Sequence, residues 1–435
     1  MAPASRRPAR SRAGKTAKQQ DAEALQEIFA GSAEIAAMNS AYDAELATSV
    51  LLGGLYRLAP VPDRAGQLAT FSELFVKHVA AQRTREAGGV LAGFAGVAPG
   101  KAAARARKAV RRFPSDQPLP AWATVTGEVT LTSTWSLTDV YGDQTQYIAA
   151  YEYADPAGGL DHAVYVQVDH NRGVVEELNL VTPGRTLVEG VKNTQAPGVT
   201  IRQVEPGVLR ADVLDAIART DALPRPPGGD AYVDQWALAV ARIESLPKGF
   251  SGGRPPPLTD QVRDELVDEF LTAYGEDLVE PGGVVPVSAA KVAARLAVDY
   301  AVDVNSGNPL RWSPTAVAGF LTEWAPRQQR VTGAVGTWLP EVLGAFVVYA
   351  GGQMHQPPHA IRRTAETIGA CWTRFTERLT NRDQPESMEV VRERMVADGV
   401  NPDDDEAARR WLTAYVEAQE EAQRPDGGEP GKTGA

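Results

Sequence analysis

The chain has 435 residues, of which 43% are hydrophobic and 23% are charged, and this globular balance excludes a wholly disordered protein. The single cysteine, Cys371, excludes an intramolecular disulfide and a cysteine-based zinc cluster. The longest apolar run, near residues 342–352, is shorter than the ~20 residues of a membrane span, and the basic N-terminus lacks the apolar segment of a secretory signal. We therefore expect a cytoplasmic protein without a transmembrane segment.

The net charge of −11 conceals an uneven distribution of charge along the chain. Residues 1–115 contain 17 basic and 9 acidic side chains, whereas residues 116–435 contain 27 basic and 46 acidic ones. Arginine outnumbers lysine 35 to 9, as is typical of a GC-rich genome, so the arginine content alone does not indicate nucleic-acid binding. A prediction of nucleic-acid binding therefore depends on where the positive charges lie along the chain.

The first part of the chain predicts an arm followed by helices. Residues 1–20 carry six positive charges and no acid, which predicts a disordered basic arm. Residues 21–115 show apolar side chains at helical spacing and predict a helical domain. Its third helix is expected over residues 63–86 and is ended by Gly88 and Gly89. An apolar stretch interrupted by glycine then leads to a basic helix over residues 101–113.

The second part predicts an antiparallel α+β domain over residues 120–247. Alternating apolar residues predict five strands, over residues 123–134, 147–153, 162–168, 174–181 and 199–204. Helical spacing predicts three helices, over residues 185–192, 208–219 and 232–246.

The remaining chain predicts a linker, a helical domain and a tail. Residues 248–257 are rich in proline and glycine and predict a linker. Residues 258–424 show helical spacing throughout and predict an all-helical domain, and residues 425–435 predict a disordered tail. The fold class expected from the whole chain is a mostly helical α+β protein.

The basic helix is the strongest functional feature of the sequence. Lys101, Arg105, Lys108 and Arg112 repeat at steps of four, three and four residues and therefore lie along one helical face. Arg107 and Arg111 form a neighbouring row. Six cations without a nearby acid in the sequence repel one another, so an anionic partner would stabilise the segment. These six side chains are the predicted nucleic-acid-binding residues.

Three partners of this helix are compatible with the sequence. The acidic later part of the same chain would neutralise the helix by folding against it. A nucleic acid would bind through its phosphates, without sequence preference and with a strong dependence on salt. An acidic membrane surface would be a further partner if the apolar residues 90–97 contributed to contact.

No motif in the sequence predicts a catalytic site, a metal site or a cofactor. His355 and His359 have helical spacing, but Pro357 and Pro358 lie between them and a third ligand is not evident. Cys371 lies on a predicted amphipathic helix, and we expect a buried structural thiol. The competing hypothesis is an enzyme with a polar site between the central and C-terminal domains, formed by Asp161, Asp169, His170 and Glu176.

Four short segments together resemble a family of uncharacterised proteins from high-GC Gram-positive bacteria. These segments are residues 140–144 (VYGDQ), 168–171 (VDHN), 309–314 (PLRWSP) and 397–400 (ADGV), the last ahead of Trp411. The resemblance covers most of residues 20–424 and implies a common ancestry without an assigned activity.

From these features we predict a binding or regulatory protein rather than an enzyme, with nucleic acid or another polyanion as the partner of the basic arm and helix. A scaffold that binds a protein partner through its helical C-terminal domain is a further alternative. The sequence leaves the oligomeric state open.

Overall fold

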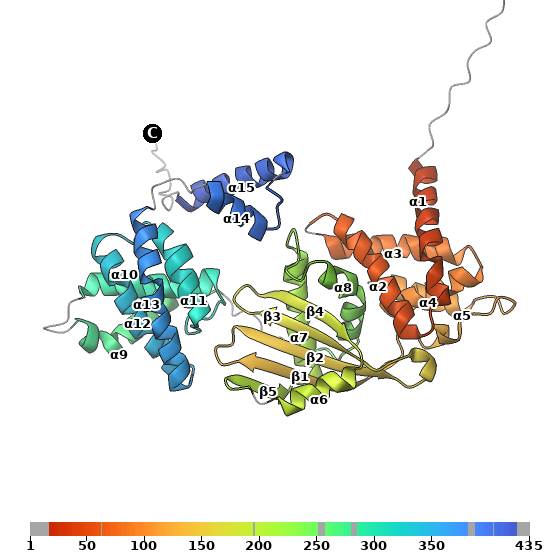
Figure 1. Ribbon diagram of the computed structural model, residues 1–435, viewed down its shortest axis with the longest axis horizontal. Helices are drawn as coiled ribbons and strands as arrows, with labels where there is room; N and C mark the ends of the chain where they lie inside the picture. Colours follow the sequence, from red (N-terminus) through yellow and green to blue (C-terminus); the bar gives the residue numbers. More distant parts are fainter. Residues whose placement is uncertain are drawn as a thin grey trace, which may run out of the picture.

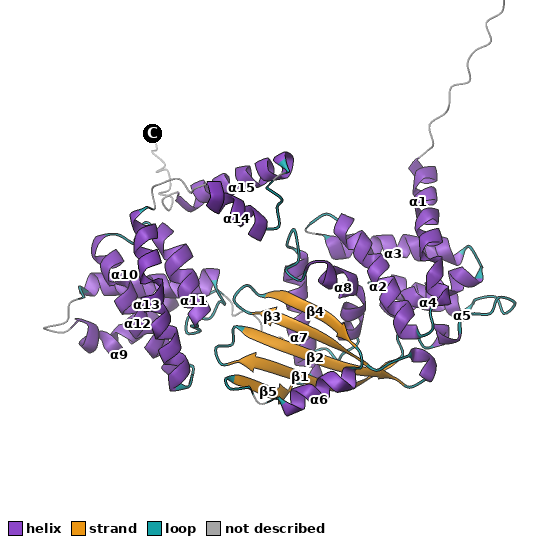
Figure 2. Cartoon of the chain, in the orientation of Figure 1, coloured by secondary structure: helices purple, strands orange, loops and turns teal. Residues whose placement is uncertain are grey.

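The computed structural model describes residues 17–61, 63–194, 196–250, 257–279, 285–381, 388–402 and 404–423. Most of the predicted basic arm, most of the predicted linker and the predicted C-terminal tail lie outside these residues. The described chain is a mostly helical α+β protein with an antiparallel sheet, as the sequence predicts. Helical segments precede and follow the sheet (Figures 1 and 2).

The N-terminal segment is helical. Its helices are α1 (Ala17–Ser32), α2 (Ala41–Leu58), α3 (Arg64–Ala80), α4 (Arg85–Val97) and α5 (Ala102–Arg111), with the 3-10 turn η1 (Ala33–Ala37) after α1. Ser40 and Thr84 cap α2 and α4, because each hydroxyl accepts a hydrogen bond from the backbone N–H three residues later.

Helix α4 corrects the predicted end of the third helix. Gly88 and Gly89 do not terminate a helix but lie inside α4, which is buried from Ala87 to Val97. A Cβ atom at Gly89 would lie 2.5 Å from Ala36 Cα, and Cβ atoms at Gly93 and Gly96 would collide with Thr48 and Glu45. The glycines therefore allow α4 to approach η1 and α2 closely, and this packing outweighs their poor intrinsic helix propensity.

The central sheet is antiparallel, with the strand order β4-β3-β2-β1-β5. Its strands are β1 (Val129–Asp139), β2 (Gln144–Tyr153), β3 (His162–Asp169), β4 (Val174–Val181) and β5 (Val199–Gln203). At the β1–β2 turn, Gly142 adopts a φ of 71° and the Asp139 carboxylate accepts hydrogen bonds from the N–H groups of Tyr141 and Gln144. The first strand begins later than predicted, because the 3-10 turn η2 (Ala121–Thr124) occupies the start of that segment.

The two faces of the sheet are covered unequally. Helices α7 (Pro206–Asp221) and α8 (Gly229–Glu244) pack on one face, where β2 and β3 present Tyr151, Val164 and Val166. The other face is covered by the short helix α6 (Gly184–Asn193), which contacts β2 and β3. A smaller buried cluster, with Ile148, Ala150 and Val188, lies under α6. Partly exposed apolar side chains therefore remain on the α6 face.

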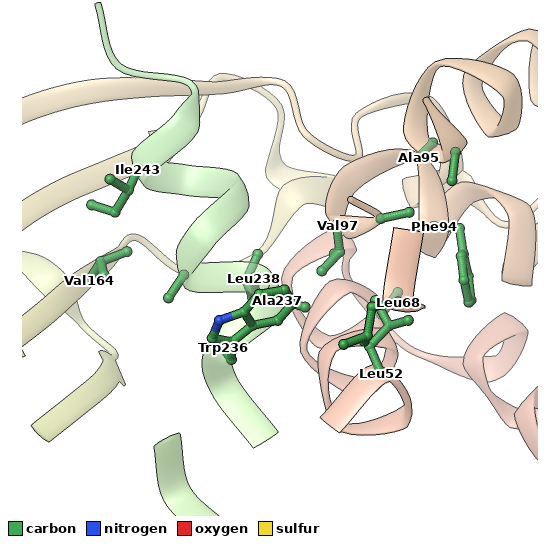
Figure 3. Close-up of a cluster of buried hydrophobic side chains, with 14 of the residues drawn as sticks. Leu52, Leu68, Phe94, Ala95, Val97, Val164, Trp236, Ala237, Leu238 and Ile243 are labelled. Atoms are coloured by element: carbon green, nitrogen blue, oxygen red, sulfur yellow. The ribbon is translucent and has the colours of Figure 1, made fainter. Parts of the chain in front are cut away.

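One hydrophobic core joins the N-terminal helices to the sheet. It extends from Phe29 to Leu246, across the two segments that the sequence divides near residue 120. Helix α8 packs closely on α2, and Figure 3 shows Leu52 and Leu68 near Trp236 and Leu238. The two segments thus contribute to one buried cluster.

The C-terminal helices have a separate core, which runs from Val267 to Phe375 and includes Trp312 and Phe346. The helices are α9 (Asp260–Val279), α10 (Val287–Asp299), α11 (Pro314–Gly319), α12 (Gly333–Gln353) and α13 (Pro358–Thr380), followed by α14 (Met388–Ala397) and α15 (Asp405–Gln423). One-turn π-helices, Tyr300–Val304 and Phe320–Trp324, extend α10 and α11. Their aromatic side chains pack on Trp312.

Helix α12 is longer than the apolar run noted in the sequence. Among the described residues it is the one helix whose length and composition would allow it to cross a membrane. Half of its most apolar stretch is buried within the protein, and a core helix meets the same criterion. It packs against α9, α10 and α13, which is the position of a core helix in this fold.

Candidate functional site

Helix α5 displays all six predicted nucleic-acid-binding side chains to solvent. Its alanine side is docked, because Ala102 and Ala106 are fully buried against the core that α3 and α4 share. The cations occupy the opposite side, and each of them is exposed; they are Lys101, Arg105, Arg107, Lys108, Arg111 and Arg112. We call these six side chains the basic face.

The basic face is largely unneutralised within the described chain. Arg105 forms an ion pair with Glu73 of α3, at 2.8 Å, and its side chain stays 55% exposed. The other five cations have no ion pair with the residues that the structure describes. Six like charges on one short helix therefore face solvent with one local counter-charge.

The position of α5 tests the alternative in which the acidic later part of the chain folds against the basic helix and neutralises its charge. Helix α5 lies at one end of the molecule and α9–α13 lie at the other (Figure 1). The acidic C-terminal helices therefore do not cover the basic face. The apolar residues 90–97, which the membrane alternative required, are buried in α4.

One flanking cation was not identified from the sequence. Phe113, which follows α5, packs against Gly88 in the first turns of α4, since a Cβ atom at Gly88 would lie 3.0 Å from its ring. Arg85 lies one turn before Gly88 and is exposed. The contact of Phe113 with Gly88 therefore places the first turn of α4, which carries Arg85, next to the end of α5, a proximity that the sequence does not show.

The four residues of the predicted enzyme site do not come together. Asp161 and His170 flank opposite ends of β3, about 30 Å apart for nine steps of extended chain at ~3.3 Å each. Asp161 accepts a hydrogen bond from Arg185 N, and Asp169 accepts one from Asn171 N within its own turn. Glu176 pairs with Arg172 near the surface. Of the four, His170 and the adjacent Asp169 lie near a larger polar cluster.

That cluster joins the sheet to the C-terminal helices. Arg311 donates hydrogen bonds of 2.7 Å to Gly142 O at the β1–β2 turn and to Asn171 Oδ1 at the β3–β4 turn. His170 N donates to Asp143 O, and His170 Nε2 lies 2.9 Å from Thr145 Oγ1. We call these residues the interdomain cluster. Three of the four segments that carry the family resemblance meet here.

Burial governs the electrostatics of the interdomain cluster. It raises the pKa of Asp143, and hydrogen bonds to Ser313 and Asn171 and the charge of Arg311 partly offset the rise. It lowers the pKa of His170, and the Arg311 charge lowers it further. At neutral pH we therefore expect a neutral His170 ring beside a charged Arg311. The arrangement fits a docking contact, because Ser313 both caps α11 and hydrogen-bonds to Asp143, and so ties the start of α11 to the β1–β2 turn.

Replacing Arg311 with alanine is expected to loosen this contact. The substitution removes two hydrogen bonds and leaves the buried Asp143 without its nearest cation, so we expect a loss of about 2 kcal/mol in the stability of interdomain docking. The measurement is the rate of limited proteolysis in the linker near residue 250, which should rise about tenfold or more. Arg172→Ala, next to Asn171 in the β3–β4 turn, removes only the ion pair with Glu176 near the surface and should leave the rate unchanged. Equal cleavage of the two variants would contradict the role of Arg311.

Within the part of the chain that the structure describes, the histidines and the cysteine singled out in the sequence do not form a metal site or a nucleophile–base pair. Among the described residues, no group of three or more histidine, cysteine or acidic side chains could hold a metal ion. His355 lies outside α13, with a φ of 54°, whereas His359 lies in its first turn. Cys371 is partly exposed on α13, and burial raises the pKa of its thiol, which disfavours the reactive thiolate.

No family model, no curated protein and no solved structure matches this chain. The resemblance to a family from high-GC Gram-positive bacteria therefore stays a prediction.

Proposed function

We propose that this chain is a cytoplasmic binding or regulatory protein that contacts nucleic acid through the basic face of α5. The observation that carries the proposal is the exposure of six cations on a helix whose other side is fixed in the core. A docked helix presents its charges without first having to order itself, so less conformational entropy opposes binding.

The size of the basic face suits a phosphate backbone. From Lys101 to Arg112 the row extends over roughly 17 Å at 1.5 Å per residue. Duplex DNA carries one negative charge per about 1.7 Å of axis, so phosphates outnumber the cations along this length. The exposed side chains of α5 are alanine, lysine and arginine, and the cations among them can contact the phosphates of any sequence. Arginine and lysine can also pair with guanine edges, so we expect binding that is mainly, rather than wholly, independent of sequence.

The membrane alternative has less support, because the apolar residues that would insert into a bilayer are buried in α4. A peripheral helix needs an apolar face as well as a cationic one. The apolar face of α5 consists mainly of alanine and is used in docking.

The test is a salt series of anisotropy titrations with a fluorescein-labelled duplex. The wild-type chain should bind, and the logarithm of its affinity should fall linearly with the logarithm of salt concentration. A variant with Lys101, Arg105, Lys108 and Arg112 changed to glutamine should lose at least about 100-fold in affinity at low salt. Its salt slope should be smaller by about 3 to 4, since each lost phosphate contact removes about 0.9.

A matched control removes the same charge elsewhere. Arg172, Lys192, Arg362 and Arg363 are exposed and lie outside α5. Changing these four to glutamine should leave the affinity within about threefold of wild type, because they make no part of the basic face.

Three outcomes would overturn the proposal. The first is negligible binding to DNA and RNA at low salt, and the second is equal binding by the α5 variant and the control. The third is stronger binding to vesicles that contain anionic lipid than to duplex. If removal of residues 1–16 abolished binding while the α5 variant retained it, the N-terminal arm rather than α5 would be the binding element.

A further inference from the structure

A groove lies on the α6 face of the sheet, away from the basic face and the core. It has a volume of about 800 Å³ and runs from the connection between β4 and α6, along α6, to the start of β5. We call it the α6 groove. Leu137 of β1, Leu187 and Val191 of α6 and Val199 of β5 supply apolar parts of its wall.

The apolar wall is unusual for this face. An antiparallel sheet with one solvated face normally alternates apolar and polar side chains, with the polar ones toward water. Here Leu137 and Ile201 lie on the α6 face and are only partly buried, because α6 is too short to cover all five strands. A concave apolar surface of this volume lies in the range of pockets that bind small molecules.

The polar groups of the groove indicate which ligand it would accept. Among the described residues that line the groove, Asp139 is the one with a charged side chain, and its carboxylate accepts hydrogen bonds from the N–H groups of the β1–β2 turn. The described residues of the wall include no lysine or arginine, and the ammonium of Lys192 on α6 lies over the Trp135 ring, so an anionic ligand would gain no counter-charge from the wall itself. The amide of Gln146 lines the groove and has no hydrogen-bond partner among the described residues. It is therefore available to a carbonyl, hydroxyl or amine group of a ligand.

We propose that the α6 groove is a binding site for a small, uncharged, mainly apolar molecule that carries one hydrogen-bonding group for Gln146. The proposal is independent of nucleic-acid binding by α5, since the two surfaces share no residue. It assigns a ligand-binding role to the central sheet.

The test compares two fluorescent probes with the same ring system. N-phenyl-1-naphthylamine is uncharged and carries an N–H group, whereas 8-anilinonaphthalene-1-sulfonate adds a negative charge. The full chain should bind the uncharged probe saturably at one site, with a rise in fluorescence. It should bind the sulfonate at least about tenfold more weakly, because the wall lacks a cation.

Filling the groove should abolish this binding. Gly190 lies on α6 in the groove wall, and a Cβ atom there would meet no other atom within 4 Å. Gly190→Trp can therefore fold while its indole occupies the groove, and we expect at least a tenfold loss in affinity for the uncharged probe. Gly369→Trp is the matched control, because Gly369 also lies in a helix, α13, with open space around it. The control should bind as the wild-type chain does.

A second position guards against misfolding of the first variant. Thr186→Trp, one turn earlier on α6, should occlude the groove in the same way. Absence of saturable binding of the uncharged probe to the wild-type chain would overturn the proposal. So would unchanged affinity in whichever groove variants keep the wild-type circular dichroism spectrum, or tighter binding of the sulfonate.

Discussion

Replacing Arg242 with methionine is expected to lower the free energy of unfolding by about 3–5 kcal/mol. Arg242 and Glu45 form an ion pair in which the side chains are 2% and 0% exposed. Arg242 also donates to Tyr153 Oη at 2.7 Å and to His162 Nε2 at 2.9 Å. Loss of the guanidinium would leave the Glu45 carboxylate buried without its counter-ion. Chemical denaturation at neutral pH measures the effect.

A double-mutant cycle separates the ion pair from the loss of packing. Glu45→Gln combined with Arg242→Met removes both charges, so the double variant should be more stable than the sum of the two single changes predicts. Arg219→Met is the surface control, because Arg219 pairs with Asp215 while both are more than a third exposed. It should cost less than about 1 kcal/mol. A change of similar size in Arg242→Met would show that the buried pair is not a major source of stability.

The same network predicts a loss of stability in acid. His162 is fully buried, and the pKa of its ring is lowered from 6.5 to about 3, first by burial and then by the Arg242 charge. The geometry agrees, because His162 Nε2 accepts from Arg242 Nε and an imidazolium could not accept. The folded chain therefore keeps this ring neutral where the unfolded chain takes up a proton.

The sign of the pH effect follows from this difference. The contribution of His162 is fully present above pH 6.5 and is lost as the pH falls from 6.5 to about 3. Within that window the slope is about 1.4 kcal/mol per pH unit for one proton. Denaturant titrations at a series of pH values measure the slope.

The control for this prediction is His162→Gln, which cannot ionise and keeps an acceptor for Arg242. Its stability should depend less steeply on pH, by about one proton over the same window. The comparison matters because other groups also titrate in acid. The pKa of Asp299, for example, is lowered by its hydrogen bonds to Arg295, Arg330 and Arg263, which outweigh the effect of its burial. Identical pH profiles for the variant and the wild-type chain would exclude His162 as the source.

Local periodicity in the sequence was a reliable guide where one face of an element is buried. The predicted strand over residues 174–181 matches β4, and the strand over residues 162–168 differs from β3 by one residue. In β3, alternate residues from Val164 onward face the core, so the pattern follows the period of the strand. In β4, where the register with β3 shifts, the buried residues are Val174, Val175 and Leu178. The basic helix was likewise found from its sequence, since its alanines and cations alternate at helical spacing.

Glycine misled the prediction at α4. Gly88 and Gly89 resemble a helix terminator in the sequence, but the close neighbours that require a glycine at these positions are Phe113 and Leu119 for Gly88 and Ala36 for Gly89, all distant along the chain. The sequence contains no local signal for that contact. The close packing of α4 on η1 and α2, rather than local helix propensity, makes these residues helical. The same packing brings α4 against the buried Glu45.

The interdomain cluster shows a similar limit. The segments with Asp143, Asn171 and Arg311 were noted for their resemblance, but nothing in their spacing predicted that they meet. The predicted enzyme site failed for the complementary reason, because Asp161 and His170 are near in sequence and lie at opposite ends of a strand.

The sequence by itself determined the fold class, most of the strands and the presence of a basic helix, because each is encoded by periodicity or charge within a short stretch. The tertiary structure alone decided which charges are neutralised. It buried Glu45 with Arg242 and left the basic face open at the end of the molecule away from the acidic helices. Counter-charges are supplied by residues distant along the chain. Net charge and local spacing therefore cannot predict which cations and carboxylates form ion pairs in the folded protein.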